Sequence, residues 1–124
     1  MSSVRSYRDL VVWQKAMELA ALCYEKTRSF TRTEAFGMTA QIRRSAASVP
    51  ANIAEGNGRE HTGSYIHSLR ISQGSLKELE THVLLAETVE LMAKADAEQI
   101  LGKSEEVGKL LRSLIRALQD KEAR

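Results

Sequence analysis

Arginine is the residue type through which this chain could bind a partner. Residues 1–77 contain 11 Lys and Arg against 6 Asp and Glu, whereas residues 78–124 contain 7 against 10. A basic front of charge +5 therefore precedes an acidic back of charge −3. Guanidinium groups bind phosphate bidentately, which favours nucleic acid as a partner of the basic front. The same side chains could instead pair with acidic residues, at the surface or across a subunit boundary. The arginines concerned are Arg28, Arg32, Arg43, Arg44, Arg59 and Arg70.

Patterns for catalysis or metal binding are weak in this sequence. His61, His67 and His82 lack metal-ligand spacing, and none follows a glutamate by three residues, as di-iron bundles require. We therefore expect no metal and no cofactor. Glu80 is expected to be partly buried, where it could pair with an arginine. A hydrolase or nuclease around Glu55 and Glu80 is a third, weaker hypothesis, but no nucleophile–base pair is visible, so we predict that the protein is not an enzyme.

Length and composition predict one all-helical domain over residues 1–124. Hydrophobic residues make up 43% of the chain, aromatic residues 5%, and there is one proline. A core of Leu, Ile, Val, Met and Ala favours helices. No apolar run approaches the roughly 20 residues of a membrane span, and "MSSVRSYRDL" lacks the apolar segment of a signal peptide. Cys23 is the single cysteine, so we expect no disulfide framework, a buried thiol and a cytoplasmic location.

The arginines and glutamates must be positioned by helices, and the first helix is expected near "SYRD". Ser6 and Asp9 fit a capping box, in which each residue's side chain bonds the other's backbone N–H. The helix should run to about Arg28. An apolar stripe at alternating spacings of three and four is predicted to face the core. This stripe consists of Leu10, Trp13, Met17, Ala20 and Tyr24.

The second helix has a clear seam but two possible starts. Thr31 with Glu34 offers one capping box, and Thr39 could cap a later start. The helix is predicted to end at Gly56, because glycine suits the left-handed position that follows a helix. The predicted core seam is Met38, Ile42, Ala46, Val49 and Ile53.

The third and fourth helices show heptad spacing. One is expected over residues 63–91, and the other opens at "DAEQ", with Asp96 as N-cap and Gln99 three residues on. Because the connections are short, we predict an antiparallel up-down-up-down four-helix bundle. The predicted core positions are Tyr65, Leu69, Ser72, Leu76, Leu79, Val83 and Ala86, followed by Ile100, Ser104, Val107, Leu111, Leu114 and Leu118.

Pro50 lies within the second helix, where proline removes a hydrogen bond and clashes with the carbonyl of Ala46. We predict a kink, near which Ser or Asn side chains, or water, satisfy the freed carbonyls. The kink could simply let the helix wrap around the core. It could also orient a polar stripe beside it as an interaction surface. That stripe is Gln41, Ser45, Ser48, Asn52 and Glu55.

The remaining side of the second helix is made largely of alanine, with Arg43 and Arg44 among the alanines. No long charged side chain occurs between Ser45 and Ala54, although a solvent-facing helix usually carries several. We infer that this helix is contacted from an additional direction, most simply by another subunit. The alanines are Ala40, Ala47, Ala51 and Ala54.

Three motifs of the sequence are "RDLVVWQKA" at residues 8–16, "FGMTAQIRRSAASVPANIAEG" at residues 36–56 and "GSLKELETH" at residues 74–82. These motifs resemble those of the four-helix-bundle family of 23S rRNA intervening-sequence proteins. Met38 and Val49 stand where the family usually has Leu and Ile. The chain also has Thr31 after Phe30, where the family often has proline, which leaves the start of the second helix open.

The resemblance implies an antiparallel bundle that assembles as a homopentamer, with no catalytic residues carried over. It also links the chain to the accessory variability protein of diversity-generating retroelements, a basic pentamer that binds a reverse transcriptase and nucleic acid. By this resemblance Arg43 and Arg44 are candidate nucleic-acid contacts, and Pro50, Asn52 and Glu55 are candidates for shaping the oligomer.

We therefore predict a non-enzymatic oligomeric bundle that binds structured RNA or DNA through a basic surface, and an accessory role to a nucleic-acid enzyme is one form that this function could take. The alternative is a protein-interaction scaffold with no nucleic-acid role. No membrane partner is expected. The predicted nucleic-acid contacts are Arg43, Arg44, Arg59 and Arg70, and the predicted oligomer-shaping residues are Ser48, Pro50, Ala51, Asn52 and Glu55.

Overall fold

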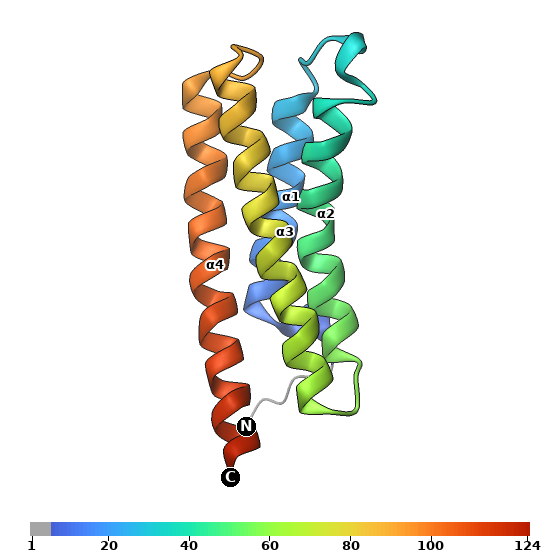
Figure 1. Cartoon of the computed structure of the whole chain (residues 1–124), viewed down its shortest axis with the longest axis vertical. Helices are drawn as coiled ribbons and strands as arrows, with labels where there is room; N and C mark the ends of the chain where they lie inside the picture. Colours follow the sequence, from blue (N-terminus) through green and yellow to red (C-terminus); the bar gives the residue numbers. More distant parts are fainter. Residues whose placement is uncertain (1–5) are drawn as a thin grey trace.

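Four long α-helices build the structure, a computed structural model that describes residues 6–124 (Figure 1). No strand occurs in this part of the chain, so the prediction of an all-helical protein with four helices is confirmed. Helices α1 and α3 each pack against both α2 and α4. In Figure 1 the three connections lie at alternate ends of the bundle. The elements are η1 (Tyr7–Asp9), α1 (Val11–Thr27), η2 (Arg32–Glu34), α2 (Met38–Asn57), α3 (Thr62–Thr88) and α4 (Lys94–Ala123).

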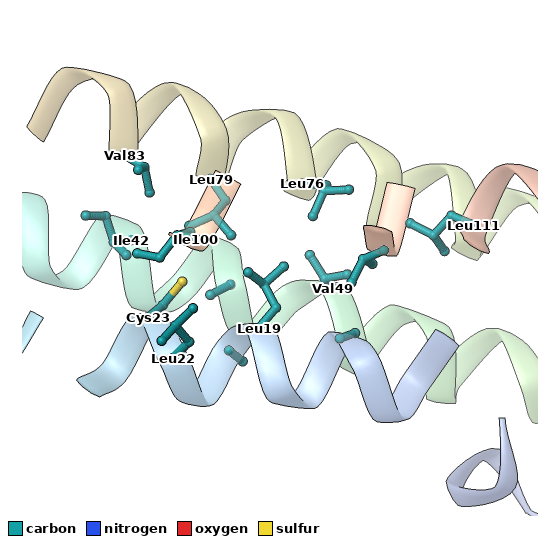
Figure 2. Packing of buried hydrophobic residues seen from close by; sticks show 14 of the residues in the cluster. Leu19, Leu22, Cys23, Ile42, Val49, Leu76, Leu79, Val83, Ile100 and Leu111 are labelled. Atoms are coloured by element: carbon teal, nitrogen blue, oxygen red, sulfur yellow. The ribbon is translucent and has the colours of Figure 1, made fainter. Parts of the chain in front are cut away.

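The core runs the length of the bundle and contains the predicted seams of α2, α3 and α4. Figure 2 shows apolar side chains from all four helices pointing toward one another. In α3 every predicted seam residue from Leu69 onward is at most 2% exposed. In α4 the seam is fully buried from Ile100 to Leu111, and the positions beyond it are partly buried. The heptad pattern therefore identified the correct face of these helices.

The predicted core face of α1 is only partly right: Leu10 and Trp13 pack against the core but are only partly buried. Met17 and Tyr24 are 44% and 42% exposed, and only Ala20 of the predicted stripe is buried. The helix is turned so that a neighbouring apolar stripe enters the core instead. Both stripes are apolar, so the 3.6-residue period by itself does not select between them. The stripe that is buried consists of Val12, Ala16, Leu19 and Cys23.

The starts of the first two α-helices also differ from the prediction. Ser6 does cap a helix, since its Oγ accepts a hydrogen bond from Arg8 N at 3.0 Å, but this helix is the short 3₁₀ turn η1. Helix α1 starts only at Val11. The residue before α2 is Gly37, so Thr31 precedes η2 and Thr39 lies inside α2.

Gly56 does not end α2 by a left-handed turn. It lies inside the helix and is buried, and Gly58 follows the helix with a φ of −82°. A Cβ at Gly56 would lie 2.7 Å from Ser68 Cβ and 2.9 Å from Tyr65 Cδ1. Glycine is needed here because α2 and α3 approach closely, rather than because of its backbone freedom.

The connection between α3 and α4 begins with a Schellman motif. Leu91 N–H donates to Ala86 O at 2.8 Å, and Glu90 N–H donates to Glu87 O at 3.0 Å. Glu90 takes the left-handed conformation, with a φ of 63°, so α3 ends at Thr88 rather than near residue 91.

Asp96 is not the N-cap of α4. The helix starts two residues earlier, at Lys94, and Asp96 lies in its first turn. Its carboxylate pairs with Lys26 Nζ of α1 at 3.2 Å. The pair joins the start of α4 to α1, and a carboxylate in the first turn also interacts favourably with the helix dipole.

Pro50 is buried inside α2, and the helix continues through it. Proline has no backbone N–H, so the carbonyl four residues earlier loses its usual partner. Side chains donate to the carbonyls next to the proline. Ser72 Oγ of α3 bonds Val49 O at 2.8 Å, and Asn52 Nδ2 bonds Ser48 O at 2.8 Å. These bonds reach the carbonyls of Ser48 and Val49, whereas no described side chain donates to the freed carbonyl of Ala46.

No helix among the described residues is long and apolar enough to cross a membrane. The expectation that "MSSVRSYRDL" is not a signal peptide falls partly on residues 1–5, which lie outside the described residues.

Candidate assembly and nucleic-acid surfaces

An apolar groove of about 490 Å³ runs between α1 and α2 on the outside of the bundle. Large side chains come from α1 and small ones from α2, which leaves space between the helices. The ring of Tyr7 packs edge-on against Trp13, with centroids 5.3 Å apart, at the α1 side. We call this surface the α1–α2 groove. It is lined by Tyr7, Trp13, Met17, Ala20, Ala21, Tyr24, Ala47, Pro50, Ala51 and Ala54.

The α1–α2 groove explains both the misassigned face of α1 and the alanine-rich side of α2. Four of the five residues of the stripe that we predicted for the core of the first helix line the groove, all but Leu10, and so do three of the four alanines noted on the second. The sequence contained a signal for this surface, because α1 carries two adjacent apolar stripes where a helix with one buried face needs only one.

The predicted oligomer-shaping residues separate into two groups. Pro50 and Ala51 line the α1–α2 groove. Ser48 and Asn52 lie on the side of α2 that faces α3, where Ser48 Oγ is 2.8 Å from Ser75 Oγ and 3.0 Å from Asn52 Nδ2. The polar stripe of α2 is thus used in packing within the chain, at least around these two residues.

Arg43 is held against α1. Its Nε donates to Thr27 Oγ1 at 2.9 Å and its Nη2 to Tyr24 O at 3.3 Å. Its guanidinium carbon lies 4.6 Å from the centroid of the Tyr24 ring, a cation–π contact. Arg43 therefore holds α2 against α1 at the Tyr24 end of the α1–α2 groove. These contacts use some of its N–H groups, so fewer remain to bind a phosphate.

The other three candidate arginines are exposed but do not form one cluster. Arg44 donates to Gln41 Oε1 of its own helix, and Arg59 pairs with Glu55 at 2.6 Å. Arg70, on α3, forms no ion pair with another described residue. Arg44 lies in the second turn of α2 and Arg59 lies just beyond its end, so about 20 Å of helix separates them at 1.5 Å per residue.

A second cleft, of about 550 Å³, lies between α3 and α4 and contains Glu80. Glu80 accepts a hydrogen bond from Ser104 Oγ at 2.5 Å and pairs with Lys77 Nζ at 3.1 Å. The prediction of a partly buried Glu80 is confirmed, but the partner is a lysine rather than an arginine. Glu55 contacts Arg59 at the other end of α2, so the two glutamates of the nuclease hypothesis have separate partners.

The described residues contain no group of three or more His, Cys, Asp or Glu side chains that could hold a metal ion. Cys23 is fully buried, and this burial raises the pKa of its thiol from 9.0 to about 12. The thiolate is the reactive form of cysteine, so Cys23 is a packing residue in the folded chain.

The raised pKa of Cys23 predicts a loss of stability in alkali. Between pH 9 and 12 the unfolded chain releases the thiol proton while the folded chain keeps it, so the free energy of unfolding falls as pH rises. Between pH 8 and pH 10 the free energy of unfolding of the protein should fall by about 1 kcal/mol more than that of its Cys23→Ala variant. Urea unfolding at several pH values measures the difference, and parallel pH profiles for the two proteins would contradict it.

Comparison with known proteins decides the family. The model of the family described as 23S rRNA-intervening sequence protein matches residues 8–113. The chain belongs to this family. The match extends from η1 into α4, and it includes all four candidate arginines and every residue that lines the α1–α2 groove except Tyr7.

A crystal structure of a protein with similar sequence shows the same fold. That protein, of unknown function, is from the S23 ribosomal protein family of Bacteroides thetaiotaomicron, and it is 30% identical to this chain. The alignment covers 85% of this intervening-sequence protein and 98% of the bacterial protein, with a TM-score of 0.76. No curated protein matches the chain.

Proposed function

We propose that this intervening-sequence protein is a non-enzymatic homo-oligomer that binds structured nucleic acid. The observation that carries the proposal is the α1–α2 groove. It leaves Met17 and Tyr24 more than 40% exposed beside a row of alanines on α2. A contiguous apolar surface of this kind is typical of an interface between proteins. A partner helix can approach alanines closely, so a second copy fits this surface well.

Nucleic-acid binding is supported by exposed arginines that an assembly would repeat. Arg44 and Arg70 are exposed and form no ion pair with a described residue. One chain presents few such groups, but several chains in one assembly bind through many weak contacts at once.

The finer features of the fold and assembly belong to the same proposal. We expect the helices to run up-down-up-down and Pro50 to kink α2, which would set the shape of the α1–α2 groove around Pro50 and Ala51. The family resemblance implies an assembly of five copies, and the single cysteine favours a cytoplasmic location. The second partner that we propose is a nucleic-acid-processing protein.

A salt titration tests nucleic-acid binding. The protein is titrated into labelled structured RNA and into duplex DNA, from low to physiological salt. We expect micromolar or tighter binding that weakens steeply with salt, and for duplex DNA a slope of about 0.9 per phosphate contacted. The double variant Arg44→Ala, Arg70→Ala should reduce both affinity and slope.

The matched control for this double variant is Arg112→Ala, Arg116→Ala, which removes the same number of exposed arginines from α4. Equal losses for the two variants would contradict the assignment of the binding surface to α2 and α3. Arg43 is left unchanged, because its contacts with Thr27 and Tyr24 stabilise the packing of α1 against α2.

A protein-interaction scaffold without a nucleic-acid role is the second candidate. It is favoured by the arginines that are already engaged, since Arg59 pairs with Glu55 and Arg43 binds α1. If neither RNA nor DNA binds even at low salt while the protein still assembles, the scaffold is the better description.

A further inference from the structure

We infer that Phe36 of one copy inserts into the α1–α2 groove of the next copy. The inference rests on the proposed self-assembly, and it names the segment that occupies the groove. Phe36 lies in the connection between α1 and α2, which projects beyond the ends of the two helices in Figure 1.

Phe36 is the most exposed large apolar residue in the described part of the chain. It is 98% exposed, and the next, Val89, is 58% exposed. At this exposure the ring contacts almost nothing of its own chain. A phenylalanine gains from burial in proportion to the apolar area removed from water, so the fully exposed ring is suited to a partner's apolar surface.

The turn that carries Phe36 is structured by hydrogen bonds on both sides of it. Gly37 N–H donates to Glu34 O at 3.1 Å, and Glu34 Oε1 accepts from Met38 N–H at 3.4 Å. The 3₁₀ turn η2 precedes it directly. Phe36 is thus presented by a defined turn, which lowers the entropy lost when the ring is immobilised in a contact.

The α1–α2 groove has the chemistry to receive an aromatic ring. Trp13 and Tyr24 contact Tyr7 and Arg43, respectively, within the chain, but Tyr24 is still 42% exposed, and Met17 offers a flexible thioether that packs well against aromatic groups. Ala47 and Ala51 opposite them leave space for the incoming ring.

Charges beside Phe36 and beside the groove are complementary. Arg28 and Arg32, on the same connection as Phe36, are exposed and form no ion pair with another described residue. Glu25 is likewise exposed and unpaired, and it follows Tyr24 of the groove directly in α1. Arg43 lies at the same end of the groove, but its guanidinium is already bound by Thr27 and Tyr24, and Glu34 beside Phe36 is bound by Met38 N–H. Among the described residues, the charges left without a partner here are thus Glu25 beside the groove and Arg28 and Arg32 beside Phe36, and these can pair when Phe36 occupies the groove of the next copy.

The contact is head-to-tail, because the inserting ring and the receiving groove are different surfaces of the chain. A head-to-tail contact generates a ring of copies when its rotation closes. If every chain lacks Phe36, or if every chain has a blocked groove, assembly should be abolished. A chain that keeps only Phe36 should still bind a chain that keeps only the groove, through a single contact.

Complementation between two defective chains tests this directly. Phe36→Ala removes the inserting ring, and Ala51→Glu blocks the groove. Each variant alone should have the mass of one chain by light scattering, with unchanged helicity by circular dichroism. Mixed, they should form a complex of two chains, in which the Ala51→Glu chain supplies Phe36. Val89→Ala, which shortens an exposed apolar side chain on another connection, is the control and should assemble as the parent does.

Trp13, the single tryptophan, reports which groove is filled. The Ala51→Glu chain also carries Trp13→Phe, so fluorescence comes only from the intact groove of the Phe36→Ala chain. We expect a blue shift of the emission as the second chain is added, and no shift when the added chain also carries Phe36→Ala.

The outcomes separate the two proposals. If Ala51→Glu gives single chains but Phe36→Ala keeps the parent mass, another segment fills the groove, and the role of Phe36 is wrong while self-assembly stands. If both variants are single chains, do not form a complex when mixed and leave the Trp13 emission unchanged, the head-to-tail contact is wrong. If the parent is itself a single chain, or both variants keep its mass, self-assembly through the groove fails as well.

Discussion

Replacing Ala51 by Glu is expected to convert the assembled protein into single folded chains. Ala51 is exposed in the isolated chain and lines the α1–α2 groove. In one chain the new carboxylate is solvated, so the fold should be retained. In an assembly that covers the groove, the carboxylate would be buried without a partner, which costs several kcal/mol. A penalty of about 4 kcal/mol corresponds to a contact weakened about 1,000-fold.

Light scattering over a range of protein concentrations measures this effect, and circular dichroism checks helicity. The matched control is Ala117→Glu, which places the same charge on an exposed alanine of α4 outside the groove. The control should keep the parent mass. An unchanged mass for Ala51→Glu would show that the groove is not covered by another copy.

Alanine at two helical glycines should change stability in opposite directions. At Gly56 the new Cβ would lie 2.7 Å from Ser68 Cβ, an atom fixed to the backbone of α3, so α2 and α3 must separate. Overpacking of this kind costs about 1–3 kcal/mol, more than the gain of up to about 1 kcal/mol in helix propensity. At Gly74 no atom lies within 4 Å of the new Cβ, so only the gain applies.

We therefore expect Gly56→Ala to lower the free energy of unfolding by about 1–2 kcal/mol and Gly74→Ala to raise it by about 0.5–1 kcal/mol. Urea unfolding measures both. Stabilisation by Gly56→Ala would mean that α2 and α3 are not closely packed at this level. Loss of assembly with Gly74→Ala would instead identify the surface around Gly74 as a contact between copies.

The α1–α2 groove supports a specific function more directly than the arginines of α2 and α3 do. The α1–α2 groove is a continuous apolar surface, and it supports a specific partner geometry. The arginines are distributed along α2 and α3, and Arg43 and Arg59 already have partners within the chain. Self-assembly is therefore the first property to measure, since nucleic-acid binding by scattered arginines depends on their repetition.

Heptad spacing in the sequence determined the core faces of α3 and α4, because only one apolar stripe on each helix keeps this spacing along the helix, whereas Ile71, Leu84 and Leu85 of α3 fall outside it and are exposed. Leu69, Leu79 and Leu111 are fully buried as that pattern predicted. The seam of α2 was found in the same way, and the family followed from motifs that the sequence displays directly.

Only the tertiary structure decided which stripe of α1 enters the core and which lines the groove. Met17 and Leu19 are both apolar, and the choice between their faces depends on how α1 is rotated against α2 and α4. The roles of Gly56 and Arg43 were also decided there, because each depends on an atom of another helix: Ser68 Cβ for the glycine and Thr27 Oγ1 for the arginine. Spacing along one helix fixes which residues share a face, but the distance to the next helix is set by packing alone.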